Sequence, residues 1–369
     1  MKYGIICTMT NGFGRKGYYN SQELGLARSI RKRGHQVVIY KGLSDGEEAE
    51  HMVTPEEIEI HYLSMRHLRA HGWLDCRILA PDIDGFLVFG DQQFFLRHIW
   101  KYCRKRKIAF VPYIGTTRSE FHATFYGKIS DFIFHITTLP IYRRLPVIAK
   151  TEAARKELEN LGVRDIRVAP VGIDASVLHK EFRKEDRAKL REKYGFSPDD
   201  VIICNVSRMD AVKRPLELLD VFVQVREKKQ FRLLIIGRGE LREQVAEKIK
   251  RLGLEKDVRM IESIPNSEMW KIYTMSDYYL NMNREEIFGM AIMEAVYYCC
   301  SVVAVNALGP SITLDGMKGH QLCNTDEELV QSLLAPYPER SALEESSARL
   351  LERFTWDRCA EAFLKIAER

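Results

Sequence analysis

The sequence has no hydrophobic run long enough to cross a membrane. Apolar runs such as 201–204 and 233–236 fall far short of the ~20 residues that a spanning helix needs. The first seven residues form a short strand-like run that meets glycines by Gly12, without the apolar core and cleavage site of a secretory signal. We therefore expect a cytoplasmic protein, which can also bind at the inner face of the membrane.

Cysteine spacings typical of metal sites are missing too. The eight cysteines are scattered or lie in apolar runs, and none forms a Cys-x-x-Cys pair or a zinc-type group with histidine. Buried, reduced thiols are the expected state, and we predict no metal site. Internal repeats and low-complexity tracts are also absent, which excludes a solenoid or a fibre.

The charge is distributed unevenly along the chain. Residues 1–150 carry 22 Lys and Arg against 14 Asp and Glu, whereas the remainder carries 34 against 37. Much of the excess lies on a helix predicted over Gln92–Lys107, with apolar residues on one face and cations on another. A solvated helix face is one interpretation. The other is attraction to an anionic membrane surface or to a phosphate-bearing acceptor; no nucleic-acid motif accompanies the charge, so we expect no nucleic-acid partner.

The chain is long enough for two domains, and short β-rich runs alternate with helical patterns in both halves. This alternation predicts an α/β protein with two doubly wound, Rossmann-like domains built on parallel sheets. The predicted strands are 3–8, 37–40, 86–89, 109–114, 147–149 and 166–169 in the first half, and 201–206, 231–236, 258–261, 278–281 and 302–305 in the second.

Local signals place several helix ends. Pro215 suits the first position of a helix that runs to about Lys228. A helical pattern over 241–252 ends at Gly253, a common residue just beyond a helix. A charged helix is predicted over 184–193, and the stretch that begins at Pro170 is interpreted as the interdomain linker.

A glycine-rich turn follows the first predicted strand. Residues 12–17 read Gly-Phe-Gly-Arg-Lys-Gly and precede a helix through 26–30, so Gly14 is a candidate for close backbone contact with a phosphate. The pattern does not match the dinucleotide-binding register, and no acidic residue stands about 20 positions on. A plain tight turn is the alternative, and a nicotinamide oxidoreductase is the least favoured function.

Two cations surround a turn at the end of the strand 201–206. Arg208 and Lys213 stand five residues apart in Ser-Arg-Met-Asp-Ala-Val-Lys, and ligands of open parallel sheets bind beyond the carboxyl ends of strands. Arginine can hold phosphate oxygens in a bidentate manner and lysine supplies a compact charge, so together they suit a diphosphate leaving group. Ordinary surface salt bridges are the alternative.

Residues 285–294, Glu-Glu-Ile-Phe-Gly-Met-Ala-Ile-Met-Glu, follow a strand and open an apolar helix. The backbone N–H groups of Phe288, Gly289 and Met290 would lie at the positive end of that helix, where they can meet a phosphate or a sugar hydroxyl. Glu286 before the helix and Glu294 inside it can accept hydrogen bonds from hydroxyl pairs. A buried Glu294 needs a polar partner; the alternative is that it lies on a solvated face.

These motifs together resemble glycosyltransferase family 4, the retaining enzymes of the GT-B fold. The resemblance covers nearly the whole chain: 26–37 looks like the family's first helix and second strand, and 170–174 resembles its interdomain Pro-x-Gly-Val-Asp. Glu286 and Glu294 have its Glu-x7-Glu spacing, and 354–368 resembles its last helix, which usually returns to the first domain. It implies an acceptor-side domain of residues 1–170 with 354–369, and a nucleotide-sugar-binding domain of residues 171–353.

The resemblance also implies roles for these residues. Arg208 and Lys213 would bind the donor's diphosphate, Glu286 would contact the donor sugar, and Glu294 would hold the ribose, with Phe288–Met290 lining the pocket. The family's chemistry is front-face substitution with retained anomeric configuration. It needs no cofactor and no metal, and Asp82-Ile83-Asp84 is interpreted as a turn rather than a metal motif.

Two segments depart from the family pattern. Where many members carry His-Gly after the fourth strand of the first domain, this chain has Tyr113–Arg118. Thr116, Arg118 and the nearby His122 are the acceptor-side candidates, although a structural role for His122 is the alternative. The family's later Gly-Gly-x-x-Glu appears as Leu-Gly-Pro-Ser over 308–311, which loses a carboxylate.

The expected function is transfer of a hexose from a nucleoside diphosphate sugar, linked to UDP or GDP, to a hydroxyl acceptor. A sugar, lipid-linked or phosphate-bearing acceptor fits the basic first half, and cell-surface glycan or glycolipid synthesis is the expected setting. Two alternatives stay open: a GT-B sugar-nucleotide epimerase or hydrolase, and a catalytically silent nucleotide-sugar-binding or interaction subunit.

Overall fold

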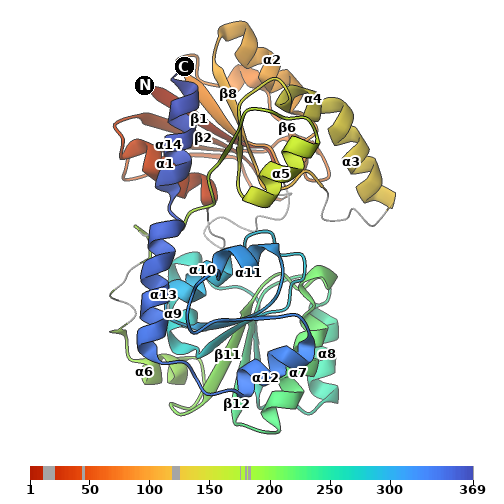
Figure 1. The fold of residues 1–369 in the computed structure, drawn as a ribbon, viewed down its shortest axis with the longest axis vertical. Coiled ribbons are helices and arrows are strands. Elements are labelled where there is room, and N and C mark those ends of the chain that lie inside the picture. Colours follow the sequence, from red (N-terminus) through yellow and green to blue (C-terminus); the bar gives the residue numbers. More distant parts are fainter. Residues whose placement is uncertain are drawn as a thin grey trace. The chain divides into compact units, whose positions relative to one another are not determined.

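The computed structural model describes residues 1–10, 21–43, 46–118, 125–174, 176–178, 181 and 184–368. The chain divides into two compact units, which are drawn in Figure 1. Unit 1 consists of Met1–Asp174 and Phe354–Arg369, and unit 2 of Ala175–Arg353. The division after Asp174 falls four residues beyond the expected one at 170.

Unit 1 is built on a sheet of eight strands in the order β10-β9-β8-β7-β1-β2-β4-β3. Its strands are β1 (Lys2–Cys7), β2 (Gln36–Gly42), β3 (Glu50–Val53), β4 (Glu59–Leu63), β7 (Gly85–Phe89), β8 (Ala109–Ile114), β9 (Val147–Ala149) and β10 (Ile166–Val168), and β5 (Arg66–Leu68) forms a separate hairpin with β6 (His71–Trp73). Every neighbouring pair in the large sheet is parallel except β3 with β4.

The prediction of a parallel sheet is therefore wrong at this edge. The strands β3 to β5 were missed because their residues are mostly exposed or half-buried, so they lack the continuous apolar run of a strand that is covered on both faces. Strand β6 has only three residues, two of which are buried. In contrast, every residue of β7 is buried, and its apolar run was predicted correctly.

The helices of unit 1 are α1 (Gln22–Arg31), α2 (Leu96–Arg106), α3 (Phe125–Thr137), α4 (Leu139–Tyr142), α5 (Glu152–Asn160) and α14 (Trp356–Ala367), with a 3-10 turn at Cys76–Ile78. The helix predicted over Gln92–Lys107 begins four residues late, since Gln92 has a φ of 49°, outside the helical region. Its two faces are as predicted: Ile99 and Cys103 are buried, whereas Arg97, Lys101, Arg104 and Lys105 are exposed.

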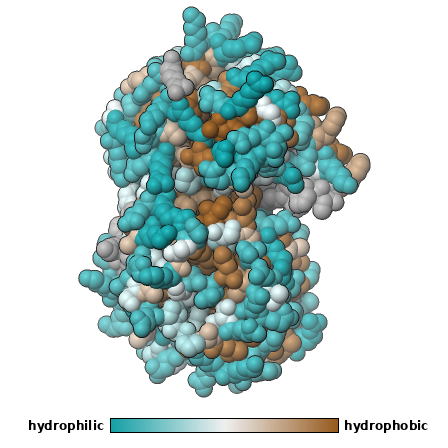
Figure 2. All heavy atoms as spheres, in the orientation of Figure 1, coloured by the Kyte–Doolittle hydropathy of each residue, from teal (hydrophilic) through white to brown (hydrophobic). Residues whose placement is uncertain are grey.

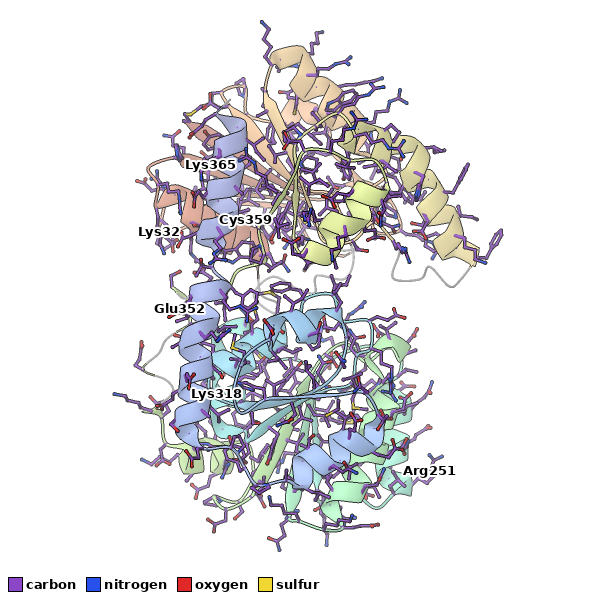
Figure 3. All side chains as sticks on the ribbon, viewed as in Figure 1. Lys32, Arg251, Lys318, Glu352, Cys359 and Lys365 are labelled. Atoms are coloured by element: carbon purple, nitrogen blue, oxygen red, sulfur yellow. The ribbon has the colours of Figure 1, made fainter. Side chains whose placement is uncertain are left out.

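The last helix belongs to unit 1. Trp356 of α14 lies so close to Gly25 of α1 that a Cβ at residue 25 would come 2.4 Å from the indole nitrogen. Ser29 donates a hydrogen bond of 2.5 Å to Asp357, which also accepts one of 2.7 Å from Arg33. Cys359, labelled in Figure 3, is buried on the same helix. Charge pairing and close packing thus join the end of the chain to its first helix.

Unit 2 contains a sheet of six parallel strands in the order β13-β12-β11-β14-β15-β16. The strands are β11 (Val201–Val206), β12 (Phe231–Ile236), β13 (Val258–Ile261), β14 (Tyr278–Asn281), β15 (Ser301–Val305) and β16 (Gln321–Cys323). The prediction of Rossmann-like domains is confirmed in both units. Only β16 was missed in this unit, because two of its three residues are exposed.

The helices of unit 2 are α6 (Arg187–Lys193), α7 (Pro215–Arg226), α8 (Arg242–Arg251), α9 (Met269–Met275), α10 (Met290–Tyr297), α11 (Leu308–Thr313), α12 (Asp326–Leu334) and α13 (Arg340–Arg353), with 3-10 turns at Ala211–Lys213 and Asn266–Glu268. Pro215 is the first residue of α7, as predicted. Gly253 has a φ of 63° just beyond α8, which is the left-handed conformation that glycine adopts at a helix end. Helix α6 begins three residues after its predicted start at 184.

Three further expectations concern local features. All eight cysteines are free, and seven of them are buried. Residues 81–82 form a turn before β7, and the Asp84 carboxylate accepts a hydrogen bond of 2.8 Å from the Lys2 amide. Among the described residues, no helix is long and apolar enough to span a bilayer.

Candidate active site

The strand order of unit 2 locates a ligand site. Numbered along the chain within the unit, the order is 3-2-1-4-5-6, and the connections change direction between β11 and β14. Loops at the carboxyl ends of two such strands leave in opposite directions and open a crevice, where doubly wound proteins bind their ligands. The loops that follow β11 and β14 carry Arg208, Lys213 and Glu286.

The loop after β11 is held by Asp210. Its Oδ1 accepts a hydrogen bond of 3.2 Å from the Lys213 amide, which caps the 3-10 turn, and its Oδ2 lies 3.3 Å from Nε of Arg208. One carboxylate therefore fixes the turn and pairs with the Arg208 guanidinium. The Arg208 side chain keeps 47% of its surface exposed, against 18% for Lys213, so Arg208 is the more accessible of the two.

The loop after β14 is built from consecutive side-chain turns. Asn281 Oδ1 accepts a hydrogen bond of 2.9 Å from the Asn283 amide, and Asn283 Oδ1 accepts one of 3.0 Å from the Glu285 amide. The Asn283 side-chain amide then donates a hydrogen bond of 3.0 Å to Oε2 of Glu286. Such short-range bonds fix a loop without regular secondary structure, and here they aim the carboxylate.

Lys213 and Glu286 form the contact between the two loops. Lys213 Nζ lies 3.1 Å from Oε2 of Glu286. Burial raises the pKa of Glu286, but the charge of Lys213 and hydrogen bonds from Asn283, Lys213 and Asn281 lower it further, so that the pKa lies below its ordinary value. Glu286 is therefore ionised at neutral pH and can accept hydrogen bonds only.

Helix α10 begins directly after this loop. Gly289 precedes the helix with a φ of 83°, a conformation that glycine adopts without strain. Phe288 beside it is buried, and Met290 is half-buried. Gly309 on α11 donates its amide to the Glu286 carbonyl oxygen over 2.6 Å, and a Cβ there would stand 2.6 Å from the Phe288 nitrogen. Glycine at 309 thus permits a close approach that shapes the entry to α10.

Glu294 lies inside unit 2 and not on a solvated face. It is 7% exposed and accepts a hydrogen bond of 2.9 Å from the Tyr273 hydroxyl. Burial, followed by the Glu294 charge, raises the pKa of Tyr273 well above its ordinary value, so this hydroxyl keeps its proton. The polar partner that a buried Glu294 requires comes from α9, and no local spacing in the sequence indicates it.

These contacts join three of the predicted donor-side residues, Arg208, Lys213 and Glu286. Arg208, Asp210, Lys213, Glu286 and Asn283 form a continuous series of ion pairs and hydrogen bonds across the switch point. Two cations with a fixed carboxylate can bind a diphosphate and a sugar hydroxyl at once. Asp210 and Asn283 were not predicted, although both stand within three residues of a predicted one.

A second set of charges stabilises the loops from outside. The two terminal nitrogens of Arg214 donate to the two carboxylate oxygens of Asp326 over 3.1 and 2.7 Å. Arg284 donates to the same carboxylate over 3.2 Å. Because Arg214 directly precedes α7, Arg284 lies in the loop after β14 and Asp326 begins α12, this cluster ties both candidate loops to the start of α12.

The acceptor-side candidates lie in unit 1, and only part of them is described. His122 lies outside the described residues, as does Gly14, which was predicted as a donor-side residue. The Thr116 amide donates a hydrogen bond of 3.2 Å to Asp91, whereas Arg118 is exposed and pairs with Glu157 over 2.9 Å. Arg118 lies at a hollow of about 400 Å³ whose lining also includes Thr117, Asp131, His135, Glu157, Asn160 and Leu161. The Thr116 hydroxyl accepts a hydrogen bond of 3.1 Å from the Arg118 amide, so these two candidates lie in one turn.

The sequence reasoning missed the charged pair at the corresponding switch point of unit 1, between β1 and β7. Asp91 follows β7 and pairs with Lys150, which follows β9, and its Oδ1 also accepts from the Gly115 amide. Thr8, just after β1, donates a hydrogen bond of 3.0 Å to Gln93. The position of Asp91 and Lys150 directly after buried strands was an available signal, and neither residue was singled out.

Comparison with known proteins places these residues in a family context. The family model "Glycosyl transferases group 1" matches residues 186–326, a range that includes Arg208, Lys213, Glu286 and Glu294. The chain is 28% identical over 231 residues to D-inositol 3-phosphate glycosyltransferase of Segniliparus rotundus, a match covering 59% of this chain and 51% of that protein. A probable sucrose-phosphate synthase of Thermosipho melanesiensis is 27% identical over 215 residues, with coverage of 55% and 47%. The chain spans about half the length of these curated relatives.

Solved structures resemble the whole chain. Sucrose-phosphate synthase from Thermosynechococcus elongatus superimposes with a TM-score of 0.76 at 15% identity, covering 100% of this chain and 98% of that one. HepE of Anabaena, solved in complex with UDP and glucose, gives 0.69 at 17% identity with the same coverage. At these identities the likeness shows the fold, which confirms the predicted GT-B class.

Proposed function

We propose that the chain is a group 1 glycosyltransferase and that it transfers a hexose from a UDP- or GDP-linked donor to a hydroxyl acceptor with retention of the anomeric configuration. The observation that carries the proposal is the series Arg208–Asp210–Lys213–Glu286 at the switch point of unit 2. It supplies two cations and one ionised carboxylate within the loops where a nucleotide ligand of this fold class binds.

Each group has a defined part in the proposed reaction. Arg208 and Lys213 neutralise the diphosphate as negative charge builds on it, which lowers the barrier to departure of the leaving group. Glu286 accepts a hydrogen bond from a hydroxyl of the donor sugar, and the amides at the start of α10, beside Phe288, Gly289 and Met290, bind the sugar or the phosphate. Glu294 binds the ribose. In this proposal the transfer needs no metal and no other cofactor.

The acceptor is proposed to bind unit 1 and to be presented at an anionic membrane surface, as in cell-surface glycan or glycolipid synthesis. The exposed cations of α2 favour such a surface. Helix α3 adds an apolar stripe: Phe125, Ile129, Phe132 and Ile136 are 81%, 40%, 65% and 58% exposed. Their spacing of four, three and four residues puts them on one helix face.

Figure 2 shows hydrophobic side chains at the right-hand edge of unit 1, where Figure 1 places α3. An apolar helix face beside exposed cations is the composition of a segment that lies in the membrane interface. The same features suit a lipid-linked acceptor, which would bring its own apolar chain and phosphate. Thr116, Arg118 and His122 are the residues proposed to meet the acceptor's polar part.

Product analysis tests the proposed reaction. The full chain is incubated with UDP- and GDP-hexoses and candidate acceptors, and the products are assigned by NMR. A glycoside with the donor's anomeric configuration is expected. Free hexose or an epimerised sugar nucleotide, formed equally with and without acceptor, would instead favour a hydrolase or an epimerase. Binding of the nucleotide sugar without any product would favour a silent binding subunit, which the altered 308–311 segment makes the second candidate.

A further inference from the structure

A group of possible metal ligands lies at the edge of unit 1, on strands that play no part in the proposed donor site. Strands β3 and β4 are antiparallel, and their register places His51 directly opposite His61. Glu59 stands two residues before His61 on β4. Because side chains two apart on a strand point to the same face, all three side chains share one face of the β3–β4 ribbon.

The geometry of the group is compact. One potential ligand atom from each of His51, Glu59 and His61 can be chosen so that all lie within 4.8 Å of one another. The two imidazole rings stack with their centroids 4.4 Å apart. Oε2 of Glu59 lies 3.8 Å from Nε2 of His61, whereas Oε1 lies 3.7 Å from Nζ of Lys2. The carboxylate thus divides its oxygens, with one directed to the lysine and the other to the histidines.

The neighbouring side chains hold His61 in place, whereas the exposed His51 side chain can rotate. Tyr40 on β2 is the strand partner of His61, and its ring stacks on that imidazole with centroids 5.2 Å apart. His61 is half-buried by this packing, whereas His51 is exposed. A tetrahedral ion with bonds of about 2.1 Å needs its ligand atoms about 3.4 Å apart. Rotation of the exposed His51 side chain can bring its ring nitrogen from the present separation, within 4.8 Å of the other ligand atoms, to that shorter distance without moving the sheet.

The donor set selects the kind of ion. Two imidazole nitrogens and one carboxylate oxygen suit zinc and similar divalent transition metals, whereas calcium and magnesium prefer oxygen ligands throughout. The donor atoms also come from both strands of the ribbon. An ion held there would link β3, the edge strand whose four residues are all exposed, to β4 and hence to the rest of the sheet.

We propose that His51, Glu59 and His61 form a binding site for a zinc-type divalent ion that clips the edge strand β3 to β4. No spacing along the chain indicates this site, because the two histidines stand ten positions apart and meet only through strand pairing. None of the three residues belongs to the proposed donor site, which lies in unit 2, or to the acceptor-side candidates of unit 1.

Titration of the metal-free full chain with Co²⁺ and Zn²⁺ tests the site, by visible absorption and by calorimetry respectively. We expect one ion per chain at this site, with binding at least about tenfold weaker in His51→Ala and His61→Gln. His67→Ala is the matched control, since His67 is an exposed histidine of the same unit on β5, and it should bind as the wild type does. Because all variants keep the eight cysteines, ion binding to thiols is common to them and cancels in the comparison.

Hydrogen exchange gives a second measurement, which reports on the rigidity of β3 and not on the affinity for the ion. With Zn²⁺ present, amides of Glu50–Val53 should exchange more slowly in the wild-type chain and in His67→Ala, but not in His51→Ala. His51 is exposed, so this variant should fold normally, and its circular dichroism and melting temperature without metal verify that. A double variant His51→Ala/His61→Gln that binds Zn²⁺ as tightly as the wild type would overturn the proposal, as would unchanged exchange of β3 in the wild type.

Discussion

Lys213 Nζ and Glu286 Oε2 lie 3.1 Å apart, although the two residues are separated by 73 positions in the sequence. They meet because β11 and β14 are neighbours in the sheet of unit 2, and each residue lies in the loop that follows its strand. The pair therefore marks the switch point from both sides. A diphosphate with its sugar would meet a lysine, an arginine and an ionised glutamate there.

Removal of either cation should impair catalysis more than folding. Arg208→Ala and Lys213→Ala are each expected to lower turnover by roughly a hundredfold or more, because a preorganised charge opposite the leaving group is lost. Initial rates with the preferred nucleotide sugar measure this.

Lys250→Ala and Arg251→Ala serve as controls for these variants. Both residues are exposed at the end of α8, and Figure 3 shows Arg251 pointing away from the body of unit 2. Helices of doubly wound units run antiparallel to their strands, so the end of α8 lies at the amino ends of the strands. The candidate site lies at their carboxyl ends. Near-wild-type rates in Arg208→Ala and Lys213→Ala would remove the phosphate assignment.

Glu286 should couple stability to pH in a defined direction. Its folded-state pKa lies below its ordinary value of 4.5, so the ionised form is stabilised by folding. That contribution is fully present above pH 4.5 and is lost as the pH falls through the lowered pKa. Glu286→Gln removes it, and we expect this variant to be less stable by about 1–3 kcal/mol at neutral pH, where Lys213 loses its charged partner.

Urea unfolding between pH 3 and pH 7, followed by tryptophan fluorescence, measures the difference between wild type and Glu286→Gln. The difference should be largest near neutrality and should shrink as the pH falls below about 4.5. A difference that stays constant over this range would show that the carboxylate of Glu286 is not held in its ionised form by Lys213.

The Tyr273 hydroxyl should be required for the burial of Glu294. Tyr273→Phe removes a donor to a buried carboxylate and is expected to cost about 1–3 kcal/mol of unfolding free energy. Tyr337→Phe is the matched control, since the Tyr337 hydroxyl donates to the Asp277 carbonyl oxygen over 3.2 Å in a residue that is 39% exposed. Equal stability losses in the two variants would contradict a special role of the Tyr273–Glu294 contact.

The apolar stripe of α3 should determine membrane binding. Phe125→Ser/Phe132→Ser is expected to weaken cosedimentation with phosphatidylserine-containing vesicles at least about tenfold, because two exposed aromatic rings can no longer enter the interface. Binding to neutral vesicles should be weaker for every form of the chain, and salt should weaken binding further. If the double variant cosediments as the wild type does, α3 is not the membrane-binding element.

The sequence predicted the parts of the fold that depend on apolar runs. Strands such as β7 and β12 are almost wholly buried, so their residues had to be apolar and were recognisable. The ribbon of β3 and β4 was missed, since its exposed His51 and half-buried Glu59 carry no such pattern. The start of α2 was placed too early, because the spacing of apolar residues does not reveal the left-handed backbone conformation of Gln92.

The same distinction applies to the candidate site. Arg208, Lys213, Glu286 and Glu294 were found because they stand at strand ends or at a recognisable spacing. Tyr273 was not, because it lies on another helix and reaches Glu294 only in the folded chain. Long-range partners of this kind depend on how elements pack, and a single sequence carries no local signal for them.

Calorimetric titration with UDP and with uridine tests whether the candidate site of unit 2 binds a diphosphate. If the donor is GDP-linked, GDP and guanosine replace them. The wild-type chain should bind the nucleoside diphosphate at least about a hundredfold more tightly than the nucleoside, and Arg208→Ala/Lys213→Ala should lose most of that difference. Equal preference for the diphosphate in the wild type and the double variant would contradict the account.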